Sequence, residues 1–181
     1  MKKKIIITGG LGYIGTELCK LYSGVSWHHD IKVVDNRFIS ERVNQLRSWN
    51  IDFIHGNILD INLVDKYFRD ADIVHHLAGV TDVPRTKSES SLDRDEKIRL
   101  VGEKGTENIL NKINKNCKII FPSTHVVYEG INEVRTDINE EELPKPILSY
   151  STSKAINEKQ LKDSGKNYII LRLGSVYGYS S

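Results

Sequence analysis

The glycine-rich segment at residues 8–15 constrains the fold of this chain more than any other feature. An apolar run, Ile5–Ile7, passes directly into the sequence Thr-Gly-Gly-Leu-Gly-Tyr-Ile-Gly. The pattern is typical of a buried strand that turns through glycines into a helix. Gly9 permits the tight turn, Gly12 lets the backbone approach a phosphate, and Gly15 lets the helix pack closely on the strand. The amides and the partial positive charge at the helix N-terminus favour an anion there, although a glycine pattern alone is weak evidence.

A second strand followed by an acid strengthens this interpretation. Ile31–Asp35 contains three apolar residues out of five and is predicted to form a strand, and Asp35 lies about twenty residues beyond Gly15, as expected within one βαβ unit. A carboxylate there accepts hydrogen bonds from an adenosine ribose and repels a 2′-phosphate, so NAD is favoured over NADP. Arg37 is a contrary hint, because an arginine can pair with a 2′-phosphate. An arginine just after a strand is more often solvated, and Asp35 opposes the phosphate in either case.

Length and charge limit the classes of protein to consider. The chain has 181 residues and a net charge of +2, which suits one domain and disfavours a protein that binds nucleic acid by neutralising phosphates. The lysines at Lys2–Lys4 precede an apolar stretch that is too short for a signal peptide or a membrane span. We therefore expect a cytoplasmic protein with no membrane or nucleic-acid partner.

Cysteine and histidine positions give no support for a metal site. Cys19 and Cys117 are isolated, so we expect two buried thiols in a reducing compartment. His75 and His76 are adjacent on a predicted strand, where successive side chains face opposite sides of the sheet. The two rings are therefore not expected to hold one metal ion together.

Six short apolar runs alternate with helix-periodic or polar sequence. Runs of this kind, rich in Val, Ile and Leu, are typical of strands covered on both faces. The alternation predicts an α/β fold, with a doubly wound, mostly parallel Rossmann sheet of about six strands and helices on both faces. The predicted strands are Lys4–Thr8, Ile31–Asp35, Asp52–His55, Ile73–Leu77, Lys118–Pro122 and Tyr168–Leu173.

The longest predicted helix covers Asp93–Asn114. Gly102 and Gly105 lie inside it, and each costs about 1 kcal/mol relative to alanine, so we expect close packing against another backbone or the cofactor there. The segment Thr81–Ser91 is interpreted as a loop at the carboxyl end of the fourth strand, the rim where ligands bind in open α/β sheets. The apolar stripe of the helix consists of Ile98, Val101, Ile109 and Ile113.

Tyr150 and Lys154 form a candidate acid–base pair. Residues four apart share one face of a helix, so the phenol and the ammonium can point at one place. A nearby ammonium favours the phenolate, and we expect it to lower the pKa of Tyr150 toward physiological pH. The carboxyl end of the strand before this helix presents Ser123 and Thr124. A hydroxyl there could bind the same substrate oxygen as Tyr150.

These motifs, in this order, resemble the extended short-chain dehydrogenase/reductase family, in its NAD-dependent epimerase/dehydratase branch that acts on nucleotide sugars. The resemblance covers nearly the whole chain. Several motifs are loose individually, but their order and spacing make a chance match very unlikely. The matching segments are Thr8–Gly15, Val33–Asn36, Gly56–Asp60, His76–Gly79, Gly105–Leu110, Pro122–Tyr128, Tyr150–Lys154 and Leu171–Gly178.

The resemblance implies a set of cofactor contacts and a reaction. Thr124, Tyr150 and Lys154 match the family's catalytic triad, in which Tyr150 takes a proton from a sugar hydroxyl while hydride passes to the nicotinamide. Thr124 would hydrogen-bond the reacting oxygen. The NAD contacts implied are Gly9, Gly12, Tyr13, Ile14 and Gly15 at the pyrophosphate, Asp35 and Asn36 at the adenosine ribose, Asn57 and Ile58 beside the adenine, Leu77, Ala78 and Gly79 on the path to the nicotinamide, and Tyr150 with Lys154 at the nicotinamide end.

The chain departs from the family pattern at several positions. Asn57 replaces an aspartate but keeps a carbonyl acceptor for adenine. Gly102 replaces an asparagine, which puts in doubt any polar relay or helix kink that depends on that amide. Sugar 4,6-dehydratases carry an acidic pair after the catalytic threonine, whereas His125 and Val126 follow here, so epimerisation or keto reduction is favoured. Ser175 replaces an asparagine that often contacts substrate.

The resemblance also implies a domain organisation. Family members continue beyond the point where this sequence stops, at Ser181, into a smaller domain that grips the nucleotide sugar. We therefore expect residues 1–181 to form the NAD-binding domain with the catalytic residues, and the substrate domain to be absent from this chain. The alternatives are a non-catalytic NAD-binding sensor or scaffold module, or a truncated fragment that is inactive on its own. A homodimer through the long helix and the Tyr150 helix is usual in such families.

Overall fold

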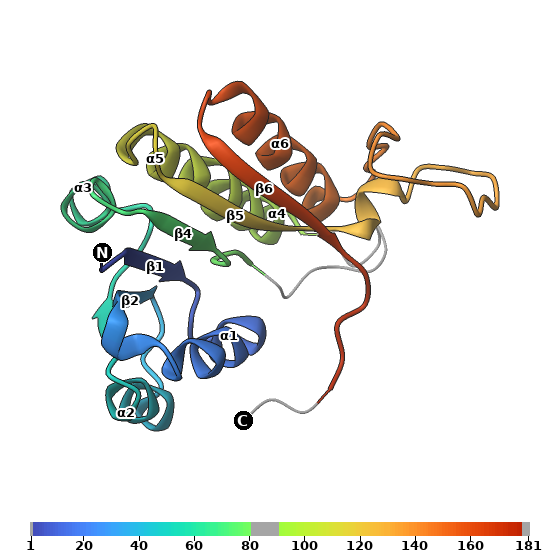
Figure 1. Cartoon of the computed structure of the whole chain (residues 1–181). Helices are drawn as coiled ribbons and strands as arrows, with labels where there is room; N and C mark the ends of the chain where they lie inside the picture. Colours follow the sequence, from blue (N-terminus) through green and yellow to red (C-terminus); the bar gives the residue numbers. More distant parts are fainter. Residues whose placement is uncertain (1, 81–90, 179–181) are drawn as a thin grey trace.

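The computed structural model describes residues 2–80 and 91–178, which form one six-stranded parallel sheet in the order β3-β2-β1-β4-β5-β6 (Figure 1). This confirms the predicted fold class. The order places the carboxyl ends of β1 and β4 side by side, at the switch point where ligands bind in doubly wound sheets. The strands are β1 (Lys4–Thr8), β2 (Asp30–Asp35), β3 (Asp52–His55), β4 (Ile73–His76), β5 (Lys118–Thr124) and β6 (Asn167–Leu173).

Four strand ends differ from the prediction by one or two residues: β4 ends at His76, β6 begins at Asn167, and the changes in β2 and β5 follow from pairing. β2 begins one residue early, at Asp30, whose N–H donates to the carbonyl of Lys3 at 2.8 Å. β5 continues past the predicted end at Pro122, because the β5–β6 ladder runs on to the pair of Thr124 with Leu173. The longer strand places Ser123 and Thr124 on rigid backbone.

Helices cover the sheet in two layers, each with its own apolar core (Figure 1). Helices α1 (Tyr13–Ser23) and α2 (Ser40–Ser48) pack on one face of β1–β3. The other face carries α3 (Ile61–Phe68), α5 (Gly105–Lys112) and α6 (Ser149–Asp163). Helix α4 (Leu92–Arg99) contacts α6. Two short helical turns, η1 (Ser26–His28) and η4 (His125–Tyr128), precede β2 and follow β5.

The long predicted helix is present but is widened in its middle. A π-helical segment, η3 (Leu100–Lys104), separates α4 from α5. Close packing at the two internal glycines is confirmed, but the neighbouring atoms belong to side chains rather than to another backbone. A Cβ atom at Gly102 would lie 2.5 Å from the hydroxyl of Ser153 on α6, and one at Gly105 would lie 2.4 Å from the side chain of Ile58. The predicted stripe is buried at Ile98, Ile109 and Ile113, whereas Val101 is partly buried.

One face of the β5–β6 edge stays open. Ile119 and Phe121 of β5 are buried in the core with Leu161 of α6. The alternate side chains of β6 face the other way, and Ile169 and Leu171 remain 40% and 44% exposed. Among the residues that the structure describes, this side of β6 is therefore uncovered.

The predicted burial of both thiols is confirmed. Burial raises the pKa of Cys19 to about 12 and that of Cys117 to about 11. Within residues 2–80 and 91–178, none of the helices has both the length and the apolar character that crossing a bilayer requires. The predicted loop at Thr81–Ser91 lies outside the described residues, except for Ser91, whose hydroxyl accepts the N–H of Arg94 and caps α4.

Candidate cofactor and catalytic site

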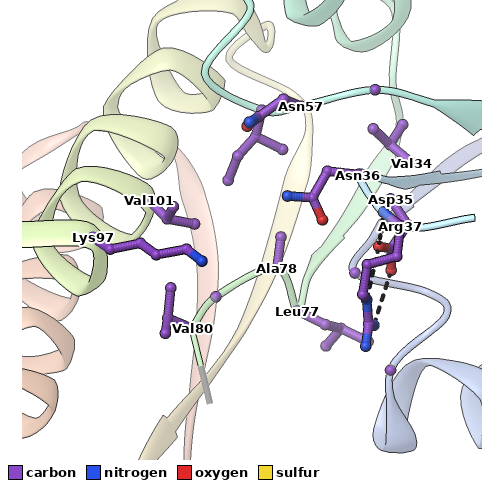
Figure 2. Close-up of a pocket in the computed structure, with 15 residues that line it drawn as sticks. Val34, Asp35, Asn36, Arg37, Asn57, Leu77, Ala78, Val80, Lys97 and Val101 are labelled. Carbon is purple, nitrogen blue, oxygen red and sulfur yellow. Dashed lines mark hydrogen bonds and ion pairs between the residues drawn. The ribbon is translucent and has the colours of Figure 1, made fainter. Parts of the chain in front are cut away.

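A cavity of about 330 Å³ opens at the carboxyl edge of the sheet, between the glycine turn, the end of β2 and helix α4 (Figure 2). Its size lies within the usual range for small-molecule pockets. Tyr13, Ile14 and Gly15, together with the predicted catalytic residues, do not line it. The predicted cofactor residues that do line it are Gly9, Gly12, Asp35, Asn36, Asn57, Ile58, Leu77, Ala78 and Gly79.

The glycine turn is shaped by contacts that exclude side chains. Gly9 has a φ of +67°, and a Cβ atom there would lie 2.8 Å from the amide nitrogen of Ala78. A Cβ atom at Gly15 would lie 2.5 Å from the carbonyl oxygen of Gly9, so Gly15 permits packing on the turn itself rather than on the strand. Gly12 caps α1 and no side chain caps this end of the helix. The first amides of α1 are therefore available to an anion.

Asp35 is buried at the rim of the cavity and holds the turn to the end of β2. Its carboxylate accepts the N–H of Leu11 at 3.0 Å and the N–H of Arg37 at 3.0 Å. The Arg37 side chain is 54% exposed, as expected for a solvated arginine, and it also pairs with this carboxylate at 3.3 Å. With a further contact of 3.4 Å from the Arg37 guanidinium, four N–H bonds reach a carboxylate that has about four acceptor positions. A ligand hydroxyl would therefore bind in place of the Arg37 side chain. Asp35 therefore has a structural role beside the predicted ribose contact.

The predicted adenine side of the cavity is only partly free. Ile58 is buried, and the side-chain carbonyl of Asn57 already accepts the N–H of Leu59 at 3.0 Å. The backbone carbonyl of Asn36 is in hydrogen-bonding contact with the His55 ring at 3.1 Å, while its side-chain amide points into the cavity (Figure 2). The amide of Asn36 is thus the better placed polar group for a base or ribose.

Helix α4 and the π segment η3 contribute one residue each that the sequence reasoning missed, Lys97 and Val101. Lys97 and Val101 lie one turn apart and line the cavity across from the glycine turn, with the Lys97 ammonium directed into it (Figure 2). Their spacing of four was the available signal, since it places both on one helix face. The other lining residues that we did not predict are Val34, Arg37, Gly56 and Val80.

The predicted catalytic residues gather where α6 begins beside the end of β5. The Lys154 ammonium donates a hydrogen bond to the carbonyl of Pro122 at 2.9 Å. It also lies 4.4 Å from the ring centroid of Phe121 and 5.8 Å from that of Tyr150. Thr124 is two residues beyond Pro122, and its buried hydroxyl accepts the N–H of Val126 at 3.3 Å.

The expected lowering of the Tyr150 pKa is not found. Burial raises the pKa of the Tyr150 phenol, and burial lowers the pKa of Lys154 to about 8, against an opposing effect of the Glu158 carboxylate. The reason is geometric. The ammonium lies at the carbonyl of Pro122 and over the aromatic rings, so desolvation dominates both groups.

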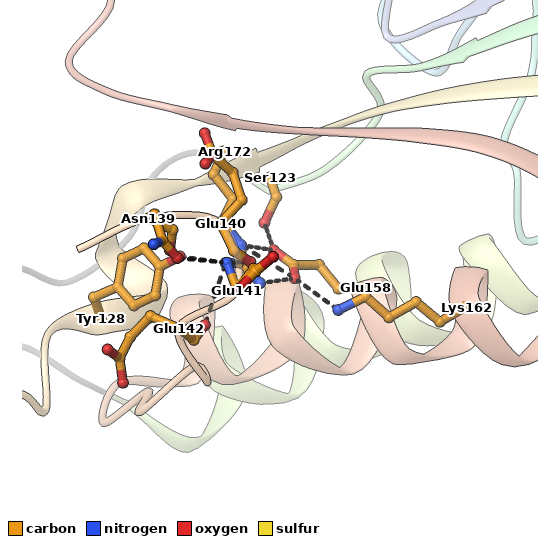
Figure 3. A network of polar contacts seen from close by, with 9 residues as sticks. All are labelled: Ser123, Tyr128, Asn139, Glu140, Glu141, Glu142, Glu158, Lys162 and Arg172. Carbon is orange, nitrogen blue, oxygen red and sulfur yellow. Dashed lines mark hydrogen bonds and ion pairs between the residues drawn. The ribbon is translucent and has the colours of Figure 1, made fainter. Parts of the chain in front are cut away.

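A buried ionic network lies beneath these residues, and the sequence reasoning missed it (Figure 3). Glu158 accepts the Ser123 hydroxyl at 2.6 Å and pairs with Arg172 of β6 through contacts of 2.7 and 3.0 Å. Arg172 also donates to the hydroxyl of Tyr128 and to the carbonyl of Glu140. The available signal was the position of Glu158, one turn after Lys154 on the same helix. The network ties α6 to the ends of β5 and β6.

A second carboxylate fixes the start of α6. Leu148, at the N-cap, supplies no side-chain hydrogen bond. Glu129 replaces the missing cap by accepting the N–H groups of Ile147 and Leu148 at 2.7 Å each, and the hydroxyl of Ser151. Burial acts in the opposite direction, but these bonds hold the pKa of Glu129 below its ordinary value. The orientation of Tyr150 therefore depends on a residue about twenty positions earlier in the chain.

The sequence of the chain also matches a known protein family whose members bind NAD. A model of the NAD-dependent epimerase/dehydratase family matches residues 5–181. The chain belongs to this family. Its most similar curated relatives include a dTDP-D-glucose 4,6-dehydratase of Dictyostelium discoideum, 31% identical over 97% of this chain and 44% of the relative. A CDP-paratose 2-epimerase of Salmonella typhi is 28% identical over 97% of this chain and 58% of the relative.

Solved structures of family members have the same fold. A UDP-glucuronic acid 4-epimerase of Bacillus cereus in complex with NAD matches with a TM-score of 0.77 and 26% identity, over 97% of this chain and 57% of that chain. A UDP-N-acetylglucosamine 4-epimerase of Methanobrevibacter ruminantium matches with a TM-score of 0.73 and 29% identity, over 95% and 55%. This chain spans about half the length of the relatives it matches.

Proposed function

We propose that this chain provides the NAD-binding and hydride-transfer part of a nucleotide-sugar epimerase. One observation carries the proposal. The glycine turn, the Asp35 carboxylate and the Tyr150–Lys154 pair all lie at the carboxyl ends of neighbouring strands of one parallel sheet. That edge is the ligand-binding edge of doubly wound sheets. The family match and the NAD-bound structures of relatives support the same cofactor.

The residues of the cavity suit NAD. Next to the cavity lining, the uncapped amides of Tyr13 and Ile14 would hold the pyrophosphate, and the Asp35 carboxylate would bind the adenosine ribose in place of the Arg37 side chain. The contacts proposed at the adenine are Asn36, Asn57, Ile58 and Val101, and those proposed toward the nicotinamide are Leu77, Ala78 and Gly79. Lys154 is proposed at the nicotinamide end, outside the lining of this cavity. When bound, the nicotinamide supplies the hydride acceptor.

The proton chemistry is assigned to three side chains. Tyr150 accepts a proton from a sugar hydroxyl and returns it when the ketone is reduced. The Thr124 hydroxyl donates a hydrogen bond to the reacting oxygen. Lys154 orients the nicotinamide ribose and, once its ammonium leaves the carbonyl of Pro122, lies close enough to favour the phenolate.

Epimerisation is proposed in preference to dehydration. Elimination of water needs an acid and a base next to the threonine, and His125 and Val126 occupy those positions. The His125 ring contacts the backbone carbonyl of Leu173 at 3.2 Å, which favours a structural role for it. The relatives include both dehydratases and epimerases, so products of turnover must decide the point.

We also propose that residues 1–181 form the cofactor domain and that the nucleotide-sugar domain lies outside these residues. The share of the relatives that the chain matches, about half, supports this, as does the open apolar face of β6. A homodimer through α4 and α6 and a cytoplasmic location complete the proposal. The two buried free thiols fit a reducing compartment. The alternative is a non-catalytic NAD-binding module.

Calorimetric titration of NAD into the protein tests the proposal. We expect saturable binding that Tyr150→Phe leaves nearly intact, and in the parent protein the same variant abolishes turnover. Asp35→Ala is expected to weaken NAD binding and to relax discrimination against NADP. Absence of NAD binding by the unaltered chain would refute the cofactor assignment, and full turnover of the Tyr150→Phe parent would refute the role of Tyr150.

A further inference from the structure

A buried chain of hydrogen bonds leads from the cavity wall into the sheet. It begins at Ala78, whose N–H donates to the Thr8 hydroxyl at 3.0 Å. The same hydroxyl lies 2.9 Å from Nδ1 of His76. Ala78 lines the cavity and its amide nitrogen sits against the Gly9 turn. A shift of this backbone would therefore change the wall of the cavity.

The chain continues through His76 to the π-helical segment. Nε2 of His76 lies 3.0 Å from the Thr106 hydroxyl, which donates to the carbonyl of Gly102 at 2.6 Å. Asn157 of α6 donates to the same carbonyl at 3.1 Å. Gly102 is the position where the family commonly has asparagine. The π segment is present without that side chain, and the Gly102 carbonyl accepts these two side-chain bonds and the N–H of Gly105.

These contacts determine where each hydrogen lies. The hydroxyl hydrogen of Thr106 goes to Gly102, so its oxygen must accept a hydrogen from Nε2 of His76. A neutral ring then leaves Nδ1 as an acceptor, and the Thr8 hydroxyl donates to it. The Thr8 oxygen remains free to accept the N–H of Ala78. All of these hydrogen bonds therefore point the same way, from Ala78 to Gly102, and each hydrogen is donated once.

Burial makes this arrangement costly to change. Thr8, His76 and Thr106 are each at most 1% exposed, so a lost partner leaves a polar group without water. The far end of the chain, Asn157, lies on α6 three residues after Lys154. The same polar chain thus touches the wall of the cavity and the helix that bears the acid–base pair.

We propose that His76 is a positioning residue for the cofactor site. As the neutral Nε2–H tautomer, it fixes the Ala78 backbone against the Gly9 turn and couples that wall, through Thr106 and Gly102, to the π segment and α6. The proposal rests on NAD binding in this cavity, as proposed above.

The tautomer can be measured without any variant. Nitrogen-15 NMR of the histidine rings of the unaltered protein is expected to show His76 neutral, protonated at Nε2 and bare at Nδ1. A proton on Nδ1 would overturn the proposal. This measurement does not involve NAD, so it remains decisive even if NAD fails to bind, an outcome that would refute the proposed function instead.

Thr106→Val keeps the shape of the side chain but removes the partner of His76. We expect the NAD dissociation constant to rise about 5-fold and the amide hydrogen of Ala78 to exchange faster. Thr106→Ser, which keeps the hydroxyl, is expected to restore both. Ser26→Ala is the control, because it removes a buried hydroxyl that donates to Ser23, away from the cavity. It is expected to leave NAD affinity unchanged.

Equal NAD affinity and equal Ala78 exchange in the valine and serine variants would overturn the positioning role. A loss of affinity in the Ser26→Ala control that matches the loss in Thr106→Val would overturn it as well, since general destabilisation would then explain both. If Thr106→Val does not fold, the comparison of Thr106→Ser with the unaltered protein takes its place. There, an unchanged tautomer and Ala78 exchange rate support the proposal, and an altered tautomer contradicts it.

Discussion

The two halves of the sheet are stabilised in different ways. Strands β1–β3 have helices on both faces, and their core residues, such as Ile6 and Val33, are fully buried. Strands β5 and β6 have α6 on one face, while Ile169 on the other face remains 40% exposed. The second half instead contains the ionic contact of Glu158 with Arg172. Apolar burial therefore orders the half that contains the glycine turn, and a polar network helps to order the half that carries the proposed catalytic residues.

The difference has a functional meaning within the proposed reaction. A cofactor that stays bound needs a rigid wall, which two-sided packing supplies. The proposed proton transfer groups must adapt to a substrate that arrives and leaves, and their neighbours Glu129, Glu158 and Arg172 are held by directional bonds rather than by packing. Such bonds specify geometry while they contribute modest net stability. The predictions below test this contrast.

Removal of Arg172 is expected to have the largest effect. Arg172→Leu leaves the carboxylate of Glu158 buried without its partner, which costs about 3–5 kcal/mol of the free energy of unfolding. Urea unfolding measures this loss. The double variant with Glu158→Met is expected to recover most of it, because no charge stays buried. A control, Arg69→Leu, breaks an ion pair with Asp65 at the surface and should leave the midpoint nearly unchanged. A small effect of Arg172→Leu would show that the network contributes little.

A matched pair of isoleucines compares the two faces at the open edge. Ile119 of β5 is fully buried on the α6 side, whereas Ile169 of β6, the partner of Ile120, is 40% exposed on the other side. We expect Ile119→Ala to lower the free energy of unfolding by about 2–5 kcal/mol and Ile169→Ala by roughly 1 kcal/mol. Chemical unfolding of both variants measures the difference. Equal losses would mean that the outer face of β6 is covered in solution.

Local sequence patterns predicted the first half of the molecule better than the second. Apolar runs, glycines and an acid at the right distance predicted the strands and the region of the cavity, because these signals come from neighbouring residues. The pairing of Glu158 with Arg172, and the reach of Lys97 into the cavity, depend on how distant helices and strands align. The pKa of Tyr150 was predicted with the wrong direction, because spacing reveals which groups are close but not how deeply they are buried.

Acid is expected to destabilise the strand at the boundary of the two halves, β4. Burial lowers the pKa of His75 to about 4, and burial together with the nearby Lys154 charge lowers that of His76 to about 3. The unfolded rings titrate near 6.5, so the unfolded state binds more protons below that pH. Stability is therefore full above pH 6.5 and falls as the pH drops, by about 2 kcal/mol for each ring at pH 5. Carboxylates ordinarily titrate below pH 5, so the change in the free energy of unfolding between pH 7 and pH 5 reports the histidines.

Urea unfolding at pH 7, 6 and 5 measures this slope. His75→Gln removes one of the two rings and is expected to halve the loss. The exposed His28 serves as the comparison, since His28→Gln should leave the slope unchanged. A free energy of unfolding that stays constant from pH 7 to 5 would contradict the buried neutral state of both rings.

The smallest predicted effect concerns Lys97. Its ammonium adds a positive charge on the side of the cavity opposite the glycine turn. Its ammonium faces the cavity, so it should attract the diphosphate of a bound nucleotide, at a gain of about 1 kcal/mol. Lys97→Gln is then expected to weaken NAD and ADP binding about 5-fold at low salt, with a smaller effect at high salt and none for adenosine. Lys104→Gln makes the same change of charge at an ammonium that pairs with Glu107, and it should leave all three affinities unchanged. If adenosine loses as much affinity as ADP, Lys97 acts on the base or the ribose rather than on the phosphates. The amides after the glycine turn would then bind the diphosphate without help from Lys97.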